Sequence, residues 1–433
     1  MRREQSPADF VLVGPDPRNK QRRFASTVAR RSEGFHPERI RSRLSQIRRY
    51  TLANLDSLVE RFIQRVSARG YASIWQASEA SDAVGIISRV VGGEKVLATN
   101  RASVIDELRP CLESNGYRLI DTYLAGYPRG VDAGKVLNHY WQLPDVSTET
   151  AFGSFAVQRP MSREGRKDYT ALLGVSAAAS EDGSVCFLQH TSNIGTMLEE
   201  AHRLILVIGI EKIVRTRPEA LFQARSMGTF GLESLVLDLK PPAKHQGAVD
   251  LGHSPFCNSS LEVHLIVLDN GRRQIARDKD FADLLTCISC HACAKHCPTH
   301  SHFSQHLWGY PKGYLWAHLI GLNPSLDLCL ECGMCVALCP LRINIPHLVS
   351  LARQRLLANW QDAINSRVMF DAWPLLRALH LSAPIANALL RNRWVRPLIE
   401  RSIGFRRDAW VPEARHRTFV QWSLRREQPG KRG

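Results

Sequence analysis

Apolar residues between positions 51 and 123 recur alternately at helical and at strand spacing. Leu55, Leu58, Phe62 and Val66 follow one another at intervals of three or four residues and predict a helix. The pattern then alternates through strands at 71–75, 95–99 and 117–123 and helices at 80–91 and 103–114. Strands that alternate with helices are typical of parallel βαβ units. This part of the chain therefore predicts an α/β domain.

The apolar pattern after residue 172 predicts the remainder of this α/β core. The expected strands are 173–180, 184–190, 204–210 and 261–268, with a turn at 181–183 and a helix at 218–225. The last strand runs into Asn270 and Gly271, a pair that suits a tight turn with positive φ. Residues 128–170 hold no regular pattern and no clear chemistry.

Eight of the eleven cysteines stand in two identical ladders of the form C-x2-C-x2-C-x3-C-P. The first ladder is Cys287, Cys290, Cys293 and Cys297, and the second is Cys329, Cys332, Cys335 and Cys339. This run binds [4Fe–4S] clusters in two-cluster ferredoxins, where the fourth cysteine ligates the other cluster. We therefore expect two [4Fe–4S] clusters that exchange their fourth ligands. Cluster 1 is expected on Cys287, Cys290, Cys293 and Cys339, and cluster 2 on Cys329, Cys332, Cys335 and Cys297.

Structural zinc is the alternative for these cysteines, because zinc also binds C-x2-C pairs. A four-ligand zinc site, however, has no need of the C-x3-C-P ending. Pro298 and Pro340 complete the two ladders, and a proline has a fixed φ and no backbone donor, which suits a turn into a helix. The ladders therefore favour clusters and a role in electron transfer.

The segment between the ladders predicts short helices. Residues 298–328 carry a mixed apolar pattern around Gly309, Pro311 and Gly313, which we interpret as two short helices with a turn at 309–313. Another helix is expected after the second ladder, through Ile345, Leu348, Leu351 and Leu356. A helical connection favours the α-helical type of two-cluster ferredoxin domain.

At 433 residues, the chain is long enough for two or three domains. We expect a basic arm and helix at 1–50, the α/β domain at 51–275, the two-cluster domain at 276–360 and a helical, basic region at 361–433. The cysteines outside the ladders are expected to be buried small apolar residues: Cys111, Cys186 and Cys257. Oxygen-sensitive clusters, and the absence of a disulfide pattern, a signal peptide or a membrane-spanning run, predict a cytoplasmic protein.

The excess positive charge lies at the two ends of the chain. Residues 1–50 hold 13 Lys and Arg against five Asp and Glu, and residues 391–433 hold 12 against four, whereas the net charge of the whole chain is +16. Such ends indicate a solvated or subunit-facing arm, or a peripheral contact with the inner face of the membrane. One set of apolar residues is followed by three arginines and is either a basic amphipathic helix or a stripe of the core. The apolar residues are Trp373, Leu375, Leu376, Leu379, Leu389 and Leu390, and the arginines are Arg391, Arg393 and Arg396. No nucleic-acid motif is present, so no nucleic-acid partner is expected.

Four stretches of the sequence resemble a known family. Residues 209–214, GIEKIV, resemble the G-I-E-K-[IV]-V signature of the lactate-utilization (LUD) domain, and residues 261–272, LEVHLIVLDNGR, are similar to its end. Residues 49–62 resemble its entry helix, and residues 410–422 resemble the closing segment of its long iron–sulfur members. With the two ladders behind them, these stretches resemble the lactate utilization protein B family.

The resemblance implies a LUD domain of the NagB/RpiA/coenzyme-A-transferase type of α/β fold, followed by the two-cluster domain. It also implies a role in the oxidation of L-lactate to pyruvate, with a cysteine-rich CCG-type redox subunit and a small LUD-domain protein as partners. Several polar pocket motifs of the family are altered or not recognisable, at residues 99–108, 121–126, 128–160 and 191–195. These departures leave the substrate open, and also whether the LUD pocket binds one.

Two sets of polar residues are candidates for chemistry. Glu211 and Lys212 are expected at the end of a strand, where neighbouring side chains point to opposite faces and do not easily enter one site. Five histidines lie in or near the first ladder: His291, His296, His300, His302 and His306. They are either surface residues, groups that tune the reduction potential of a nearby cluster, or additional metal ligands. No G-x-G-x-x-G motif follows an expected strand and no Walker loop is present, so no nicotinamide, flavin or ATP site of those types is expected.

Three functions are compatible with these features. The one we predict is an iron–sulfur electron-transfer subunit of a complex that oxidises L-lactate or a related 2-hydroxy acid without NAD. The second is a self-sufficient oxidoreductase whose LUD pocket binds the organic substrate. The third is an electron-wiring or scaffold subunit of another redox complex, heterodisulfide-reductase-like or quinone-linked, with a degenerate LUD pocket.

Overall fold

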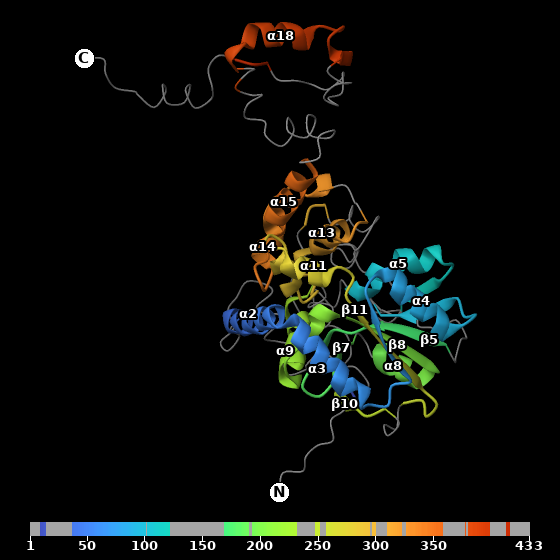
Figure 1. Ribbon diagram of the computed structural model, residues 1–433. Coiled ribbons are helices and arrows are strands. Elements are labelled where there is room, and N and C mark those ends of the chain that lie inside the picture. Colours follow the sequence, from blue (N-terminus) through green and yellow to red (C-terminus); the bar gives the residue numbers. More distant parts are fainter. Residues whose placement is uncertain are drawn as a thin grey trace, which may run out of the picture. The chain divides into compact units, whose positions relative to one another are not determined.

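The computed structural model describes two compact units, Met1–Val349 and Ser350–Gly433. The residues described are 9–13, 37–100, 102–121, 169–189, 193–231, 247–251, 257–294, 297–299, 310–322, 326–357, 377, 380–398 and 413–415. The first unit contains two sheets and all eight ladder cysteines. Its sheets and the helices around them are labelled in Figure 1.

The larger sheet has six strands, all paired in parallel, in the order β2-β11-β8-β5-β3-β4. The strands are β2 (Ser73–Ala77), β3 (Val96–Thr99), β4 (Arg118–Asp121), β5 (Thr170–Gly174), β8 (Arg203–Gly209) and β11 (Glu262–Leu268). Helices α4 (Ala80–Val91) and α5 (Ser103–Ser114) follow β2 and β3, with the bounds that the sequence predicts. The predicted parallel βαβ units are therefore confirmed.

Alternate side chains of the central strands enter two different cores. In β8, Leu204, Leu206 and Ile208 pack on the face that also receives α3 (Leu55–Ser67) and α8 (Asn193–Glu200). Ile205 and Val207 of the same strand pack with α4 and α5 on the other face. Successive side chains of a strand point to opposite faces, so a continuous apolar run such as β8 is buried on both sides.

The second sheet has five strands in the order β10-β1-β7-β6-β9. They are β1 (Phe10–Val13), β6 (Ala177–Ala179), β7 (Val185–Leu188), β9 (Ile213–Val214) and β10 (Gly247–Val249). The interpretation of residues 1–50 as an arm and a helix missed β1, whose four apolar residues are buried between β7 and β10. The single strand expected at 173–180 is also wrong, because β5 and β6 belong to different sheets.

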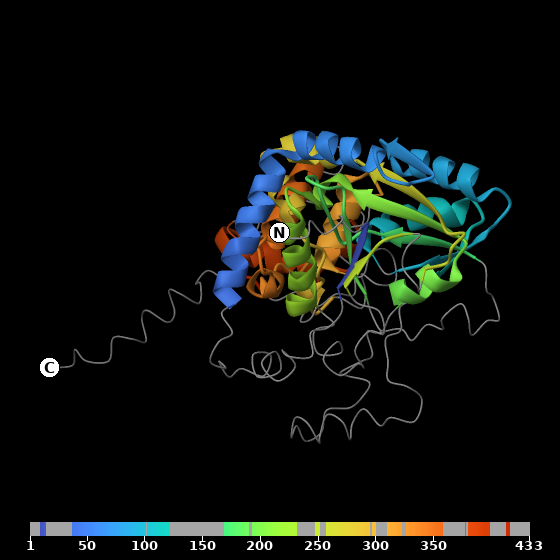
Figure 2. The same ribbon diagram turned by 90° about the horizontal axis from the view of Figure 1, so that it is seen from below.

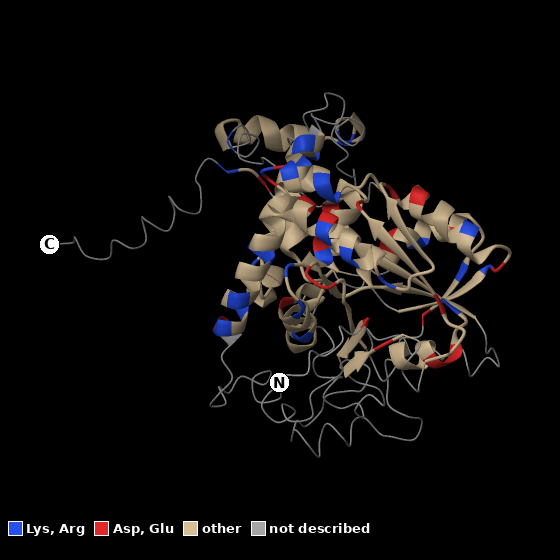
Figure 3. Ribbon diagram, turned by 60° about the horizontal axis from the view of Figure 1, so that its bottom comes forward, with Lys and Arg blue, Asp and Glu red and all other residues tan. Residues whose placement is uncertain are grey.

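Two helices cover the outer face of the smaller sheet. These are α2 (Pro37–Ala53) and α9 (Arg217–Phe230), which run side by side in Figure 2. Ile47 of α2 and Ala220 and Ala224 of α9 pack with β1 and β6 in one core. The start of α9 is fixed by a capping box, in which the Thr216 side chain accepts from the backbone of Glu219. Lys and Arg residues lie along α2 in Figure 3, in the basic part of the chain that the sequence singles out.

The ladder region consists of short helical segments. They are α11 (Arg272–Arg277), η4 (Ala282–Thr286), η5 (Ala292–Ala294), α13 (Pro311–Leu319), η6 (Leu326–Leu328), α14 (Met334–Leu338) and α15 (Ile345–Leu357). The helix expected after the second ladder is confirmed by α15. Helix α13 begins at Pro311, so Gly313 lies in the helix and not in the expected turn. The other expected helix, with Gly309, lies outside the described residues.

The second unit contains the helix α18 (Ala383–Arg391). Most of the stripe expected around Trp373 lies outside the described residues. Among the helices that are described, none is long and apolar enough to span a membrane.

Candidate metal centre

The first ladder begins where η4 ends, at Cys287. The chain after it turns tightly, because Ser289 and His291 both have positive φ, 58° and 59°. In this loop the backbone N–H of Ser289 donates to Cys287 Sγ over 3.3 Å. Burial raises the pKa of Cys293 well above its usual value, and the thiols of Cys287 and Cys290 raise it further. The thiols of Cys287 and Cys290 therefore lie close enough to Cys293 to influence its ionisation.

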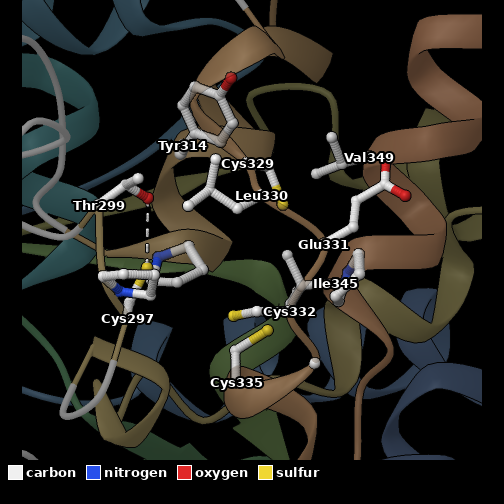
Figure 4. Close-up of a pocket in the computed structure, with 14 residues that line it drawn as sticks. Cys297, Thr299, Tyr314, Cys329, Leu330, Glu331, Cys332, Cys335, Ile345 and Val349 are labelled. Atoms are coloured by element: carbon white, nitrogen blue, oxygen red, sulfur yellow. Dashed lines mark hydrogen bonds between the residues drawn. The ribbon is translucent and has the colours of Figure 1, made fainter. Parts of the chain in front are cut away.

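The second ladder lines a hollow beside α13 and α15. The hollow encloses about 390 Å³ of space that includes open solvent, and its wall contains four cysteines: Cys297, Cys329, Cys332 and Cys335. Figure 4 shows these side chains around it, with Tyr314, Leu330, Ile345 and Val349 as apolar neighbours. Burial raises the pKa of Cys335 to about 12, with contributions from Cys329, Cys297 and Cys332. Cys297 of the first ladder therefore lies with three cysteines of the second.

Cys339 makes the reverse connection. It directly follows α14, and burial raises its pKa, with Cys287 as the next cause. Its thiol also raises the pKa of Cys293. Cys339 thus lies near Cys287 and Cys293 of the first ladder, and Cys297 lies near the first three cysteines of the second.

These two cysteine groups fit iron–sulfur clusters as cofactors. Iron–sulfur clusters take cysteine thiolates as ligands, and a buried thiol that resists ionisation is deprotonated when a metal binds it. Among the described residues, no group of three or more His, Cys, Asp or Glu is arranged to hold a metal ion.

Glu211 and Lys212 lie together, against the expectation from the sequence. They belong to a 3-10 turn, η3 (Ile210–Lys212), and not to a strand, so their side chains do not alternate between faces. Lys212 Nζ lies 3.8 Å from Glu211 Oε1. The same ammonium group donates to the Cys287 carbonyl over 3.3 Å and to Ser289 Oγ over 2.8 Å. The LUD-like signature segment therefore contacts the first ladder directly.

A buried ion network continues from Glu211. Arg272 binds Glu211 and also Glu107, with 2.7 Å between its Nη2 and Glu107 Oε1. Burial alone would raise the pKa of Glu211, but Arg272, Lys212 and Lys312 outweigh it and lower that pKa to about 2. Burial alone would lower the pKa of Arg272, but Glu107 and Glu211 raise it. Glu211 and Arg272 are therefore both ionised at neutral pH.

Arg48 and Lys312 bring two further cations to the same region. The Arg48 guanidinium donates to the carbonyls of Leu285 and Thr286, at 2.7 and 2.9 Å, just before Cys287. Lys312 Nζ lies 4.1 Å from the centre of the Trp316 ring, and Arg272 lies over the same ring. Sequence reasoning missed Arg48, Glu107 and Lys312, because no local pattern links α2, α5 and α13.

The remaining candidates from the sequence are the histidines near the first ladder and the three cysteines outside the ladders. His291 stacks on Tyr310 with ring centroids 4.1 Å apart, whereas the other four histidines near the first ladder lie outside the described residues. Cys186 is fully buried, as predicted, and burial raises its pKa to about 12. Cys111 and Cys257 are only partly buried, against the edges of the two main cores.

Two family models match the chain. A LUD domain model matches residues 59–234, and a 4Fe-4S dicluster domain model matches residues 283–343. These matches confirm the predicted order of a LUD-type α/β domain followed by an iron–sulfur domain. They also favour iron–sulfur clusters over zinc for the ladders.

Curated relatives match most of the chain. Lactate utilization protein B from Geobacillus thermodenitrificans is 28% identical over 356 residues, which cover 74% of this chain and 72% of that protein. The uncharacterized electron transport protein YkgF from Escherichia coli is 27% identical, covering 75% and 72%. A solved DUF162 family protein from Deinococcus radiodurans covers 49% of this chain and 98% of its own, with 18% identity and a TM-score of 0.25.

Proposed function

Because the chain is a LUD-domain iron–sulfur protein of the lactate utilization protein B family, we propose that it carries two [4Fe–4S] clusters and transfers electrons through them. It acts as a subunit of a complex that oxidises L-lactate or a related 2-hydroxy acid. The observation that carries this proposal is the grouping of the eight ladder cysteines into two sets of four. Each set supplies the four thiolates that one cubane needs.

We assign the ligands by this grouping. Cluster 1 is held by Cys287, Cys290, Cys293 and Cys339, and cluster 2 by Cys329, Cys332, Cys335 and Cys297. Because each ladder contributes to both clusters, the two clusters share the same short segments of chain. When bound, they supply one-electron chemistry, while the chain fixes their surroundings and their access to solvent.

An electron conduit accounts for the LUD-domain residues better than a self-sufficient dehydrogenase does. Glu211 and Lys212 are buried and bonded to Arg272 and to the first ladder. Both side chains are therefore already engaged in contacts with other residues of the same chain. The altered pocket motifs point the same way. The altered motifs are also compatible with the alternative function, an electron-wiring subunit of a heterodisulfide-reductase-like or quinone-linked complex.

The proposed partners are a cysteine-rich CCG-type redox subunit and a small LUD-domain protein. Cluster 2 is the cluster that exchanges electrons with a partner, because its ligand Cys332 is exposed. Leu330 and Met334, which flank this ligand, are exposed as well. Exposed apolar side chains beside a cluster ligand suit a docking partner that must approach the cluster closely.

The cofactor content tests this proposal. The chain is purified without oxygen, and its iron, sulfide and zinc are measured together with the EPR spin count after dithionite. We expect about eight irons and eight sulfides per chain and two reducible clusters. Stoichiometric zinc, or a single cluster of about four irons, would contradict the two-cluster assignment.

We also propose a peripheral membrane contact through the face of α18. Five large apolar side chains on and beside this helix are at least 49% exposed: Leu381, Ile385, Leu389, Trp394 and Leu398. Ile385 and Leu389 are four residues apart and share one side of α18, whereas Leu381 lies just before the helix. Arg391, Arg393 and Arg396 follow directly, and arginines beside an apolar face suit an anionic lipid surface.

Vesicle binding tests this contact. We expect the full chain to sediment with vesicles that contain anionic phosphatidylglycerol, and much less with phosphatidylcholine alone. Ile385→Glu is expected to weaken this binding about tenfold or more, because burying an isoleucine contributes about 1.5–3 kcal/mol. Leu322→Glu, at another exposed leucine, is the matched control and should bind as the native chain does. Equal binding by both variants would contradict the contact.

A further inference from the structure

Six buried charged side chains meet beside the first cysteine ladder. Four are cations and two are carboxylates: Arg48, Lys212, Arg272, Lys312, Glu107 and Glu211. Each of them is less than a tenth exposed. They come from α2, α5, η3, α11 and α13, so several distant segments converge on one place.

The cations are directed at the segment that carries cluster 1. Lys212 donates to the Cys287 carbonyl and to Ser289 Oγ, and Ser289 in turn accepts from Ser103 at the start of α5, over 3.0 Å. Arg48 donates to the two carbonyls that precede Cys287. Lys312 lies in the first turn of α13, and its backbone N–H lies near the Cys293 thiol. Lys212 therefore contacts the ladder loop directly, and Arg48 binds the segment that immediately precedes it.

The charges of this group do not cancel. Among these six residues, two carboxylates face four cations, which is an excess of two positive charges. Uncompensated buried charge is strongly unfavourable, so a counter-charge is required. A [4Fe–4S] cluster with four thiolate ligands has a net charge of about −2 when oxidised and about −3 when reduced. Such a cluster supplies the missing negative charge.

The position of this group in the fold is also informative. Lys212 follows the carboxyl end of β8, Arg272 follows that of β11, and Ser103 follows that of β3. In open α/β sheets, ligands bind at the carboxyl ends of the strands. Here the same edge receives the cysteine loop. The edge at which an organic ligand would be expected is therefore occupied by the cluster-binding segment.

We propose that these residues form a buried cationic cradle for cluster 1, in which Lys212 is a positioning residue that raises the reduction potential of that cluster. Reduction adds a negative charge, and a nearby fixed cation stabilises the reduced form. The inference rests on the proposed two-cluster function. It assigns the signature segment GIEKIV to electron transfer and not to substrate binding.

Charge-changing variants of the loaded full chain test the cradle. EPR-monitored redox titration gives the potentials of both clusters in Lys212→Met, Glu211→Gln and the exposed control Lys279→Met. Lys212→Met is expected to make cluster 1 at least tenfold harder to reduce, which is 59 mV for a one-electron couple. Glu211→Gln is expected to shift cluster 1 in the opposite direction. Cluster 2 and the control should keep their potentials.

The outcomes separate this inference from the proposed function. If the native chain holds no pair of clusters, the proposed function fails first. If both clusters are present but neither variant moves the potential of cluster 1, or both move it in the same direction, the cradle is overturned. If Lys212→Met does not hold cluster 1, Lys312→Met is measured in its place. It is also expected to make cluster 1 harder to reduce, and an unchanged potential of cluster 1 would overturn the cradle.

Discussion

Replacing Cys293 by serine is expected to remove or convert one cluster and to lower the iron content from about eight toward about four per chain. Cys293 is partly buried and lies near the thiols of Cys287, Cys290 and Cys339. Among the described ladder residues, any other thiolate that replaced it would have to leave the second group. A hydroxyl group is a much poorer ligand for iron than a thiolate. Iron, sulfide and the dithionite-reduced EPR spectrum measure the loss.

Cys257→Ser is the matched control for this substitution. Cys257 is partly buried at the edge of a core and belongs to neither ladder. The control should keep both clusters and the native spectrum. Unchanged iron content and an unchanged spectrum in Cys293→Ser would show that Cys293 is not a ligand.

Two double variants combine Cys293→Ser with a second substitution, at Cys339 or at Cys335. Their iron contents are expected to differ by one whole cluster, although Cys335 and Cys339 belong to the same ladder. Cys293→Ser with Cys339→Ser should spare cluster 2 and leave about four irons. Cys293→Ser with Cys335→Ser should damage both clusters and leave almost none. The reason is the exchange of fourth cysteines, since Cys339 lies near Cys287 and Cys293, whereas Cys335 lies near Cys297.

Iron analysis of the two purified double variants distinguishes the two arrangements. The single variants Cys335→Ser and Cys339→Ser serve as references, and each should keep one cluster. If each ladder held its own cluster, both double variants would lose all their iron. Equal loss in the two would therefore contradict the exchange.

The sequence predicts the ladder region and the parallel sheet because both have local signatures. A cluster needs cysteines at fixed spacing, so its ligands are visible in two short stretches. Helices α4 and α5 and strand β8 carry strong apolar periodicity, and the structure has them at the expected positions. The family models confirm the two domain types, whereas the individual ligand assignments stay predictions.

Other features depend on contacts between distant residues, which no local pattern encodes. Glu107 and Arg272 are separated by 165 positions, and Arg48 and Thr286 by 238. Glu211 and Lys212 were expected on opposite faces, because an apolar strand directly precedes them, but the chain leaves the strand at Gly209 and turns. Strand β1 was missed because four residues are too short for a periodic pattern. Tertiary packing decides each of these cases.

The role as a conduit is tested most directly by asking which reductant the oxidised chain accepts. EPR spectra of the anaerobically purified chain are recorded first after L-lactate and then after dithionite. If the chain only transfers electrons, lactate alone produces no reduced-cluster signal, and dithionite produces the signals of both clusters. Reduced-cluster signals with lactate alone would contradict the conduit and make the chain itself the dehydrogenase.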